Sequence, residues 1–154
     1  MAGFAQKAAQ PERKGGLSNL LYVVAQAQNL PCELEGLVNE VTVLFPWGSL
    51  LKAVARGDEE FLAGLAQVMT HRASLRVVFS LEDSIEKKVM DSLGLASINK
   101  ESLDALCAAY ARVGFTMKWR YISQDELKKF PSRWAKRLAY GRPRPVVELL
   151  GKKF

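Results

Sequence analysis

The residues best suited to chemistry are two tryptophans that lie far apart in the chain, Trp47 and Trp134. Trp47 follows Phe45 and Pro46, where a strand is expected to end, and Trp134 lies in the strongly basic segment 130–144. Indole rings stack on nucleic-acid bases and guanidinium groups bind phosphate, so the two segments together suit the binding of an RNA base. The pattern predicts a protein that binds RNA and presents one base to chemistry.

The positive charge is concentrated at the carboxyl end of the chain. The 154 residues carry a formal net charge of +6. From Lys128 onward the chain contains nine Lys and Arg residues and one acid, Glu148. This end therefore has a charge of +8, which leaves −2 for the first 127 residues. A near-neutral body with a basic end predicts a localised contact with a polyanion. A solvated basic tail is the alternative interpretation.

The cations near the two tryptophan segments and near the first turn are the expected RNA contacts. Helical spacing places Arg133, Lys136 and Arg137, which flank Trp134, near one face of a helix. Such an arrangement suits contact with a phosphate backbone. Salt bridges to surface acids are the alternative for any single one. The candidates are Lys7, Arg13, Lys14, Arg133, Lys136, Arg137, Arg142 and Arg144.

Composition argues against several other classes of protein. Cys32 and Cys107 are far apart and have no Cys-x-x-Cys spacing, so neither a zinc site nor a disulfide framework is expected and no metal is predicted. The single histidine, His71, follows an apolar-periodic stretch and is expected at the end of a helix rather than in a site. No apolar run reaches the length of a membrane span, and the start is unlike a signal peptide. A soluble, cytoplasmic protein without membrane contact is expected.

Apolar runs bounded by turn residues predict strands that alternate with helices in one domain spanning residues 1–154. Strands are expected at residues 20–25, 41–45, 75–80, 115–122 and 146–150. Helices are expected at residues 48–55, 58–70, 82–93 and 100–113, with the end of another in residues 1–10. Pro11 and the Lys14-Gly15-Gly16 turn end that first helix, and Asp58 is a candidate N-cap. The order predicts an α/β fold with a mostly parallel sheet and an antiparallel final pair of strands.

Three collinear motifs carry a resemblance to a known family. They are Lys14-Gly15-Gly16-Leu17-Ser18-Asn19, Phe45-Pro46-Trp47-Gly48-Ser49-Leu50-Leu51 and Trp134-Ala135-Lys136-Arg137-Leu138-Ala139-Tyr140-Gly141-Arg142. The chain resembles, from about Pro11 to Gly151, the aminoglycoside-resistance methyltransferases that modify N1 of the decoding-site adenine in 16S ribosomal RNA. The resemblance implies S-adenosylmethionine as cofactor, a Rossmann-like class I methyltransferase fold, and 16S rRNA within the small ribosomal subunit as partner.

The resemblance also implies roles for residues at the two tryptophan segments. Trp47 would stack on the target adenine and Trp134 would close its other face, whereas Trp119 is expected in the core. Ser132 would orient the adenine or the cofactor, and a helix N-cap after Pro131 is the alternative. Because adenine N1 already carries a free lone pair at neutral pH, no general base is required.

The implied cofactor contacts are Ala27, Gln28, Trp47 and Ser49. Gln28 stands where an acidic residue is expected in an active relative. Its amide can still hydrogen-bond an amino group but carries no charge. For Ser49, a place at the start of a helix is the alternative to a contact with the cofactor.

The sequence departs from the family at its cofactor motif. Members of the family carry a glycine-rich turn after their first strand and an acidic residue after their second strand. This sequence has neither feature and contains no Gly-x-Gly. The expected fold is therefore an incomplete, truncated methyltransferase domain without the first two strands, with exposed sheet edges that favour self-association. The expected function is methylation of the 16S rRNA adenine, which confers aminoglycoside resistance. A noncatalytic RNA-binding remnant of such an enzyme, or a small-molecule methyltransferase, is the alternative.

Overall fold

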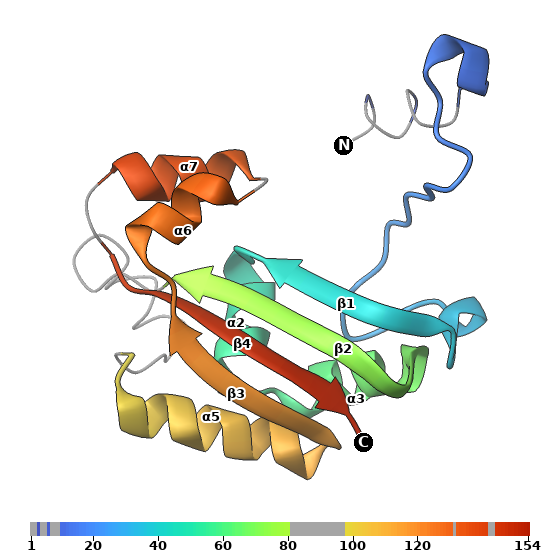
Figure 1. Cartoon of the computed structure of the whole chain (residues 1–154). Helices are drawn as coiled ribbons and strands as arrows, with labels where there is room; N and C mark the ends of the chain where they lie inside the picture. The colour runs from blue at the N-terminus through green and yellow to red at the C-terminus, as the bar shows by residue number, and fades with distance from the viewer. Residues whose placement is uncertain (1–2, 4–5, 7–9, 81–97, 131, 142–143) are drawn as a thin grey trace.

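The computed structural model describes residues 3, 6, 10–80, 98–130, 132–141 and 144–154 and forms an α/β structure. Its strands are β1 (Val38–Leu44), β2 (Met69–Ser80), β3 (Phe115–Tyr121) and β4 (Val146–Lys153). Its helices are the short 3-10 helices η1 (Glu12–Lys14) and η2 (Cys32–Leu34), and α2 (Gly48–Arg56), α3 (Glu59–Val68), α5 (Lys100–Arg112), α6 (Gln124–Lys129) and α7 (Arg133–Tyr140). Figure 1 shows the sheet with α2, α3 and α5 on one side and the α6–α7 pair at one end.

The four strands form a mixed sheet in the order β1-β2-β4-β3. The β1–β2 pair is parallel, and β4 runs antiparallel to both of its neighbours, β2 and β3. The expected antiparallel final pair is therefore present. The described sheet is mixed rather than mostly parallel as expected, because β4 is inserted between two strands that run in the opposite direction.

The main core lies between one face of the sheet and three helices. Alternate residues of the strands, such as Val77, Leu149 and Met117, contribute to it together with Phe61 of α3 and Tyr110 of α5. Burial of this apolar surface supplies the main stabilisation. Trp119 packs against the same cluster and its Nε1 donates a hydrogen bond to Asp104 at 2.7 Å, as expected for a structural tryptophan.

A second, smaller core attaches the α6–α7 pair to the end of the sheet. It contains Val78 of β2 and Val146 of β4, which meet Leu127 of α6 and Leu138 of α7. Phe45, at the end of β1, packs against it from the side. This cluster is what brings α7, and with it Trp134, to the end of the sheet where β1 and β2 finish.

The strand expected at residues 20–25 is absent. These residues have no ladder partner, and the only bridge nearby joins Gln26 to Asn29. Leu21 is 80% exposed and Val24 98% exposed. An apolar run forms a buried strand only where neighbouring strands take its backbone hydrogen bonds, and no described strand lies beside this one.

Other expectations differ at the boundaries. The helix expected to reach Thr70 ends at Val68, and β2 begins at Met69, so His71 lies in an exposed part of a strand and not at a helix end. Asp58 caps α3 as predicted, accepting a hydrogen bond from the Phe61 backbone N–H at 2.9 Å. Gly15 closes the first turn in a left-handed conformation with φ 83°. The helix expected at residues 82–93, and nearly all of that at 1–10, lie outside the described residues.

Candidate functional site

The turn after β1 brings Trp47 to the surface. Phe45 has a left-handed backbone (φ 48°), which a non-glycine residue adopts at a cost, and Pro46 follows it. Trp47 is the N-cap residue of α2 but makes no capping hydrogen bond, and its side chain is 63% exposed. The strained turn therefore places an indole at the carboxyl end of a parallel strand, where α/β folds bind ligands.

Trp134 reaches the same place from the other end of the chain. Ser132 caps α7 by accepting a hydrogen bond from the Ala135 backbone N–H at 3.4 Å. Ala135 and Leu138 bury one side of the helix in the second core, which leaves Trp134, 43% exposed, facing away from it.

One cavity of about 330 Å³, the tryptophan cavity, is lined by Trp47, Trp134 and Ser132 together with Leu44 and Phe45. The lining is mostly aromatic and apolar with one hydroxyl. A pocket of this volume is at the lower end of the range for small ligands, and two indoles can stack on a planar group. The sequence motif gives no role to Phe45, and only the fold identifies it as a wall of this cavity.

The basic residues of α7 are on the same helix as Trp134. Arg133, Lys136 and Arg137 are all exposed on the helix. The Arg137 guanidinium lies over the Trp134 ring at 5.5 Å from its centroid, a cation–π geometry. Arg137 therefore contacts the indole directly, a neighbour that the sequence did not reveal.

The other predicted RNA contacts are distributed differently. Arg13 and Lys14 are exposed in η1, which Figure 1 shows well apart from α7. Arg144 is partly exposed just before β4, and Lys7 and Arg142 lie outside the described residues. Of the α7 cations, Arg137 thus contacts a tryptophan of the cavity, whereas Arg13 and Lys14 belong to a separate segment.

Three of the four predicted cofactor contacts line a second cavity of about 610 Å³. Ala27, Gln28 and Ser49 lie there, and the other lining residues are Ala25, Gln26, Leu50 and Glu60. Trp47, the fourth, is not in this lining but lies two residues before Ser49. Ser49 is in the first turn of α2, so the alternative placement at a helix start also holds.

Glu60 is the one carboxylate in that lining and was missed in the sequence. It stands in the first turn of α3, two residues after the N-cap Asp58. Acids are common in a first turn because they interact favourably with the helix dipole. No signal in a single sequence distinguishes Glu60 from such a residue.

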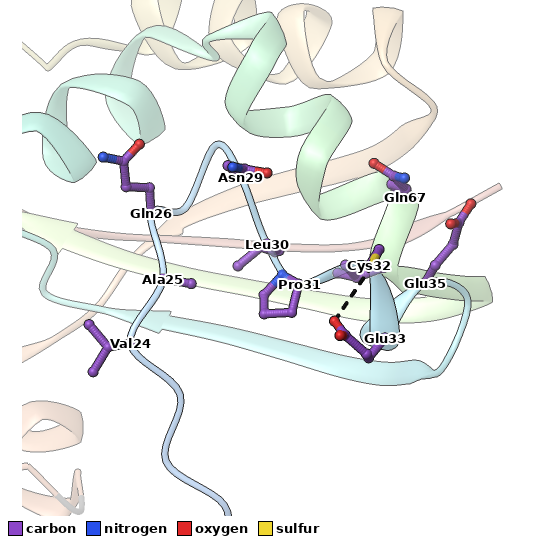
Figure 2. A pocket seen from close by; sticks show the side chains of 11 residues that line it. Val24, Ala25, Gln26, Asn29, Leu30, Pro31, Cys32, Glu33, Glu35 and Gln67 are labelled. Carbon is purple, nitrogen blue, oxygen red and sulfur yellow. Dashed lines mark hydrogen bonds between the residues drawn. The ribbon is translucent and has the colours of Figure 1, made fainter.

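A third cavity, of about 540 Å³, is lined mainly by residues of the 24–35 segment (Figure 2). It shares Ala25 and Gln26 with the second cavity. The Cys32 thiol donates a hydrogen bond to the carboxylate of the adjacent Glu33 at 3.6 Å, and both cysteines are free thiols. Burial, with the charge of Asp104 adding to it, raises the pKa of Cys107.

Ionic interactions behind the tryptophan cavity centre on Glu148, the buried acid of β4. Arg76 and Arg120 each bind it at 2.6 Å, and Arg120 also binds Glu126 of α6 at 2.6 Å. The hydrogen bond from the Ser123 backbone N–H, and then that from Arg120, lower the pKa of Glu126 to about 2. The hydrogen bond with Glu126 raises the pKa of Arg120. Arg120 and Glu126 are therefore both charged over the whole physiological range.

Within the described part of the chain, no group of three His, Cys, Asp or Glu residues is arranged to hold a metal ion. None of the helices described there is long and apolar enough to span a bilayer.

Known proteins of one family match this chain over nearly its whole length. Residues 1–153 match the family NpmA: 16S rRNA (adenine(1408)-N(1))-methyltransferase. The 16S rRNA (adenine(1408)-N(1))-methyltransferase of Escherichia coli is 33% identical over 90% of this chain and 64% of its own length. That of Streptoalloteichus hindustanus is 37% identical over 99% of this chain and 71% of its own length. The chain thus spans about two thirds of the length of these relatives.

The described structure also resembles solved methyltransferases. A tryptophan-to-alanine mutant of the 16S rRNA (adenine(1408)-N(1))-methyltransferase of Catenulisporales acidiphilia, crystallised with cosubstrate SAM, matches with a TM-score of 0.84 and 28% identity. The match covers 99% of this chain and 70% of that one. These findings confirm the resemblance carried by the three motifs and an α/β methyltransferase fold. The chain belongs to the family of 16S rRNA (adenine(1408)-N(1))-methyltransferases.

Proposed function

We propose that this chain acts in the S-adenosylmethionine-dependent methylation of N1 of the decoding-site adenine in 16S rRNA, and so in resistance to aminoglycosides. The observation that carries the proposal is the cavity lined by Trp47, Trp134 and Ser132. Two indoles from distant parts of the chain and one hydroxyl suit a planar base that also offers a polar edge. The partner would be the assembled small subunit in the cytoplasm, without a membrane or metal.

In this proposal the base leaves its stack and enters between the two indoles. Each base–aromatic contact returns about 1–3 kcal/mol, which offsets the cost of unstacking. Adenine N1 attacks with its own lone pair, so the chain's residues need only hold N1 in line and stabilise the positive charge that develops on the ring. Stacked indole faces favour a cation. Ser132 would orient the base while its oxygen also caps α7.

The cavity of Ala27, Gln28, Ser49 and Glu60 suits the nucleoside part of the cofactor. Its amide, hydroxyl and carboxylate groups can bind amino and hydroxyl groups of a nucleoside. Once bound, the cofactor would supply an electrophilic methyl group, whose bond to the sulfonium sulfur breaks as the bond to N1 forms, so that the sulfur leaves as a neutral thioether. Because Gln28 is uncharged, Glu60 would supply the negative charge of this lining.

The basic residues would hold the ribosomal RNA through its phosphates. Arg133, Lys136, Arg137, Arg142 and Arg144 would act near the flipped base, and Lys7, Arg13 and Lys14 would act at a separate contact. Such a dispersed set reads the shape and the phosphates of folded RNA rather than its sequence.

We further propose that the four described strands are part of a larger Rossmann-like class I methyltransferase sheet. The exposed apolar residues 20–24 and the edge of β1 that no other described strand pairs with support this proposal, because both have the character of surfaces that further strands would cover. In that arrangement residues 20–25 would take the strand conformation that they lack here.

The test compares Trp47→Ala and Trp134→Ala with the wild-type chain on isolated small subunits. Each variant should lose methylation at the target adenine by roughly fivefold to a hundredfold, the loss of one stacking contact. Primer extension across the adenine measures the product. The matched control is Phe154→Ala, which removes an exposed aromatic that lines a cavity with Lys152 and Lys153, away from the tryptophans. Unchanged methylation in both tryptophan variants would refute the role of the cavity.

Titration with S-adenosylmethionine and with subunits separates the two alternatives. A chain that binds subunits but gives no heat with the cofactor at millimolar concentration is a noncatalytic RNA-binding protein. A small-molecule methyltransferase would bind its substrate with little dependence on salt, whereas binding to RNA phosphates weakens steeply as salt rises.

A further inference from the structure

We infer that Glu148 is a positioning residue, which fixes the α6–α7 pair and the wall of the tryptophan cavity relative to the sheet. The inference rests on the proposed function, because it concerns how Trp134 is held opposite Trp47. Glu148 itself does not line the cavity, and nothing in its place on a strand marks it in the sequence as part of a site.

Glu148 is a buried charge whose two oxygens are both engaged. Its side chain is 1% exposed. Oε1 accepts a hydrogen bond from Arg76 Nε at 2.7 Å and lies 2.6 Å from Arg76 Nη2, and Oε2 accepts a hydrogen bond from Arg120 Nε at 2.6 Å. A carboxylate bonded from both sides holds its two arginines in fixed directions, because the geometry of guanidinium–carboxylate pairs is narrow.

Two series of contacts, termed arms, start at Glu148. The first arm runs from Glu148 through Arg76 to the wall of the tryptophan cavity. The Arg76 guanidinium lies over the Phe130 ring at 4.7 Å from its centroid. Phe130 ends α6 and packs edge to face against Phe45, with centroids 6.3 Å apart. Phe45 lines the cavity and carries the strained backbone that turns the chain toward Trp47. The packing around Phe45 therefore helps to maintain a conformation that is unfavourable by itself.

The second arm runs from Glu148 to the start of α6. Arg120 joins Glu148 to Glu126, at 2.6 Å from each carboxylate. Glu126 in turn accepts hydrogen bonds from the backbone N–H and the hydroxyl of Ser123, which closes a capping box at the N-terminus of α6. The first turn of α6 is thus connected to β3 and β4 by charged groups.

The first arm reaches the end of α6 at Phe130, and the second arm reaches the first turn of α6 at Glu126. Leu127 of α6 and Leu138 of α7 share the second core, so a shift of α6 would move α7 and Trp134 with it. Apolar packing alone tolerates such shifts better than hydrogen-bonded ion pairs do, because it has little directionality. A buried ion pair is weak evidence for stability, and its best-attested use is to select one geometry. That is the role inferred for Glu148.

The experiment uses Glu148→Gln and Arg120→Gln, with Arg112→Gln as the matched control. Glu148→Gln keeps the size of the side chain but loses its charge and one acceptor. Arg120→Gln opens only the second arm and leaves Glu148 paired with Arg76, so it tests the inference even if Glu148→Gln folds poorly. Arg112 makes an exposed ion pair with Glu59 at 3.7 Å, on α5, away from the cavity.

The first readout is amide hydrogen exchange in residues 124–140, compared with residues 100–112. Both test variants should raise exchange in α6 and α7, on the order of tenfold, with α5 unchanged, because local opening is confined to the element that loses its anchor. The control should leave both regions unchanged. Equal acceleration in α5 would mean that the network stabilises the whole fold, and unchanged exchange in α7 would mean that it positions nothing. Either result would overturn the inference.

The second readout is methylation of small subunits at saturating and at limiting subunit concentration. Misplacement of Trp134 should lower the rate at saturation by a larger factor than it lowers subunit affinity, because the phosphate-binding charges remain on the chain. If the wild-type chain fails to methylate subunits, the proposed function fails, whereas the exchange result still decides the role of Glu148.

Discussion

The guanidinium of Arg137 lies 5.5 Å from the centroid of the Trp134 indole, one turn of α7 away from it. One face of the indole is thus in contact with a cation before any ligand arrives. We expect this contact to limit the side-chain rotations of Trp134 and to leave its other face for a base. Arg137 then differs from the neighbouring Lys136, which has no such contact with Trp134 among those described.

This difference leads to a prediction about two adjacent cations. Arg137→Gln should weaken subunit binding more than Lys136→Gln, by the added loss of a cation–π contact worth about 0.5–1 kcal/mol at an exposed site. Both variants should reduce the slope of log affinity against log salt by a similar amount, since each removes one charge. Filter binding over a range of salt concentrations measures both quantities. Equal losses of affinity at every salt concentration would contradict the contact with Trp134.

Ser132 has two candidate roles that substitution can separate. Ser132→Ala removes the N-cap of α7 and should lower the free energy of unfolding by about 1 kcal/mol, measured by urea denaturation. Ser132→Asn retains a capping oxygen and should recover that stability. If Ser132→Asn also recovers methylation, the serine acts through the cap alone. Stability recovered without activity would support a direct contact with the base.

Acid should weaken the attachment of α6 through Glu126. Hydrogen bonds from the Ser123 backbone N–H and from Arg120 lower the pKa of this carboxyl from its ordinary 4.5 to about 2. A lowered pKa in the folded state stabilises the fold above the unfolded value, and the contribution is lost as pH falls from about 4.5 toward 2. Melting temperatures in this range should therefore fall less steeply for Glu126→Gln than for the wild type. Identical slopes would refute the assignment.

The second cavity predicts a difference between two neighbouring acids. Glu60 lines it with Gln28, whereas Glu59 faces Arg112 of α5. Glu60→Gln and Gln28→Ala should each weaken binding of S-adenosylmethionine several-fold, about 1 kcal/mol for one hydrogen bond. Glu59→Gln is the control and should bind as the wild type does. Calorimetric titration decides, and a wild-type affinity for Glu60→Gln would remove Glu60 from the cofactor site.

Exposed apolar residues predict self-association of this chain. The segment 20–24 presents contiguous apolar side chains, including Leu21 and Val24, and surfaces of this kind promote contacts between molecules. Leu21→Lys with Val24→Lys should shift the chain toward the monomer without lowering its melting temperature, since neither side chain is in the core. Sedimentation velocity at several concentrations measures the shift. An unchanged distribution would place any association elsewhere, for example on the edge of β1.

Local sequence determined most of the elements. Helix α5 and strand β3 lie within a residue of their expected bounds, and the N-cap Asp58 and the turn at Gly15 were recognisable because their conformational requirements are met by a few neighbouring residues. The motifs around Trp47 and Trp134 identified the family. Periodicity could not place the start of β2 at Met69, since the end of α3 and the start of the strand share one apolar run.

Tertiary structure decided the relationships between distant segments. The apolar run 20–25 has the composition of a buried strand, yet whether it forms one depends on a partner strand that the run itself does not encode. In the same way, Trp47 and Trp134 meet because a strained turn at Phe45 and a small core under α7 orient them toward one cavity. Residue types are local properties, whereas the direction of a side chain depends on packing between elements. The sequence could therefore name the two indoles, and only the fold could bring them together.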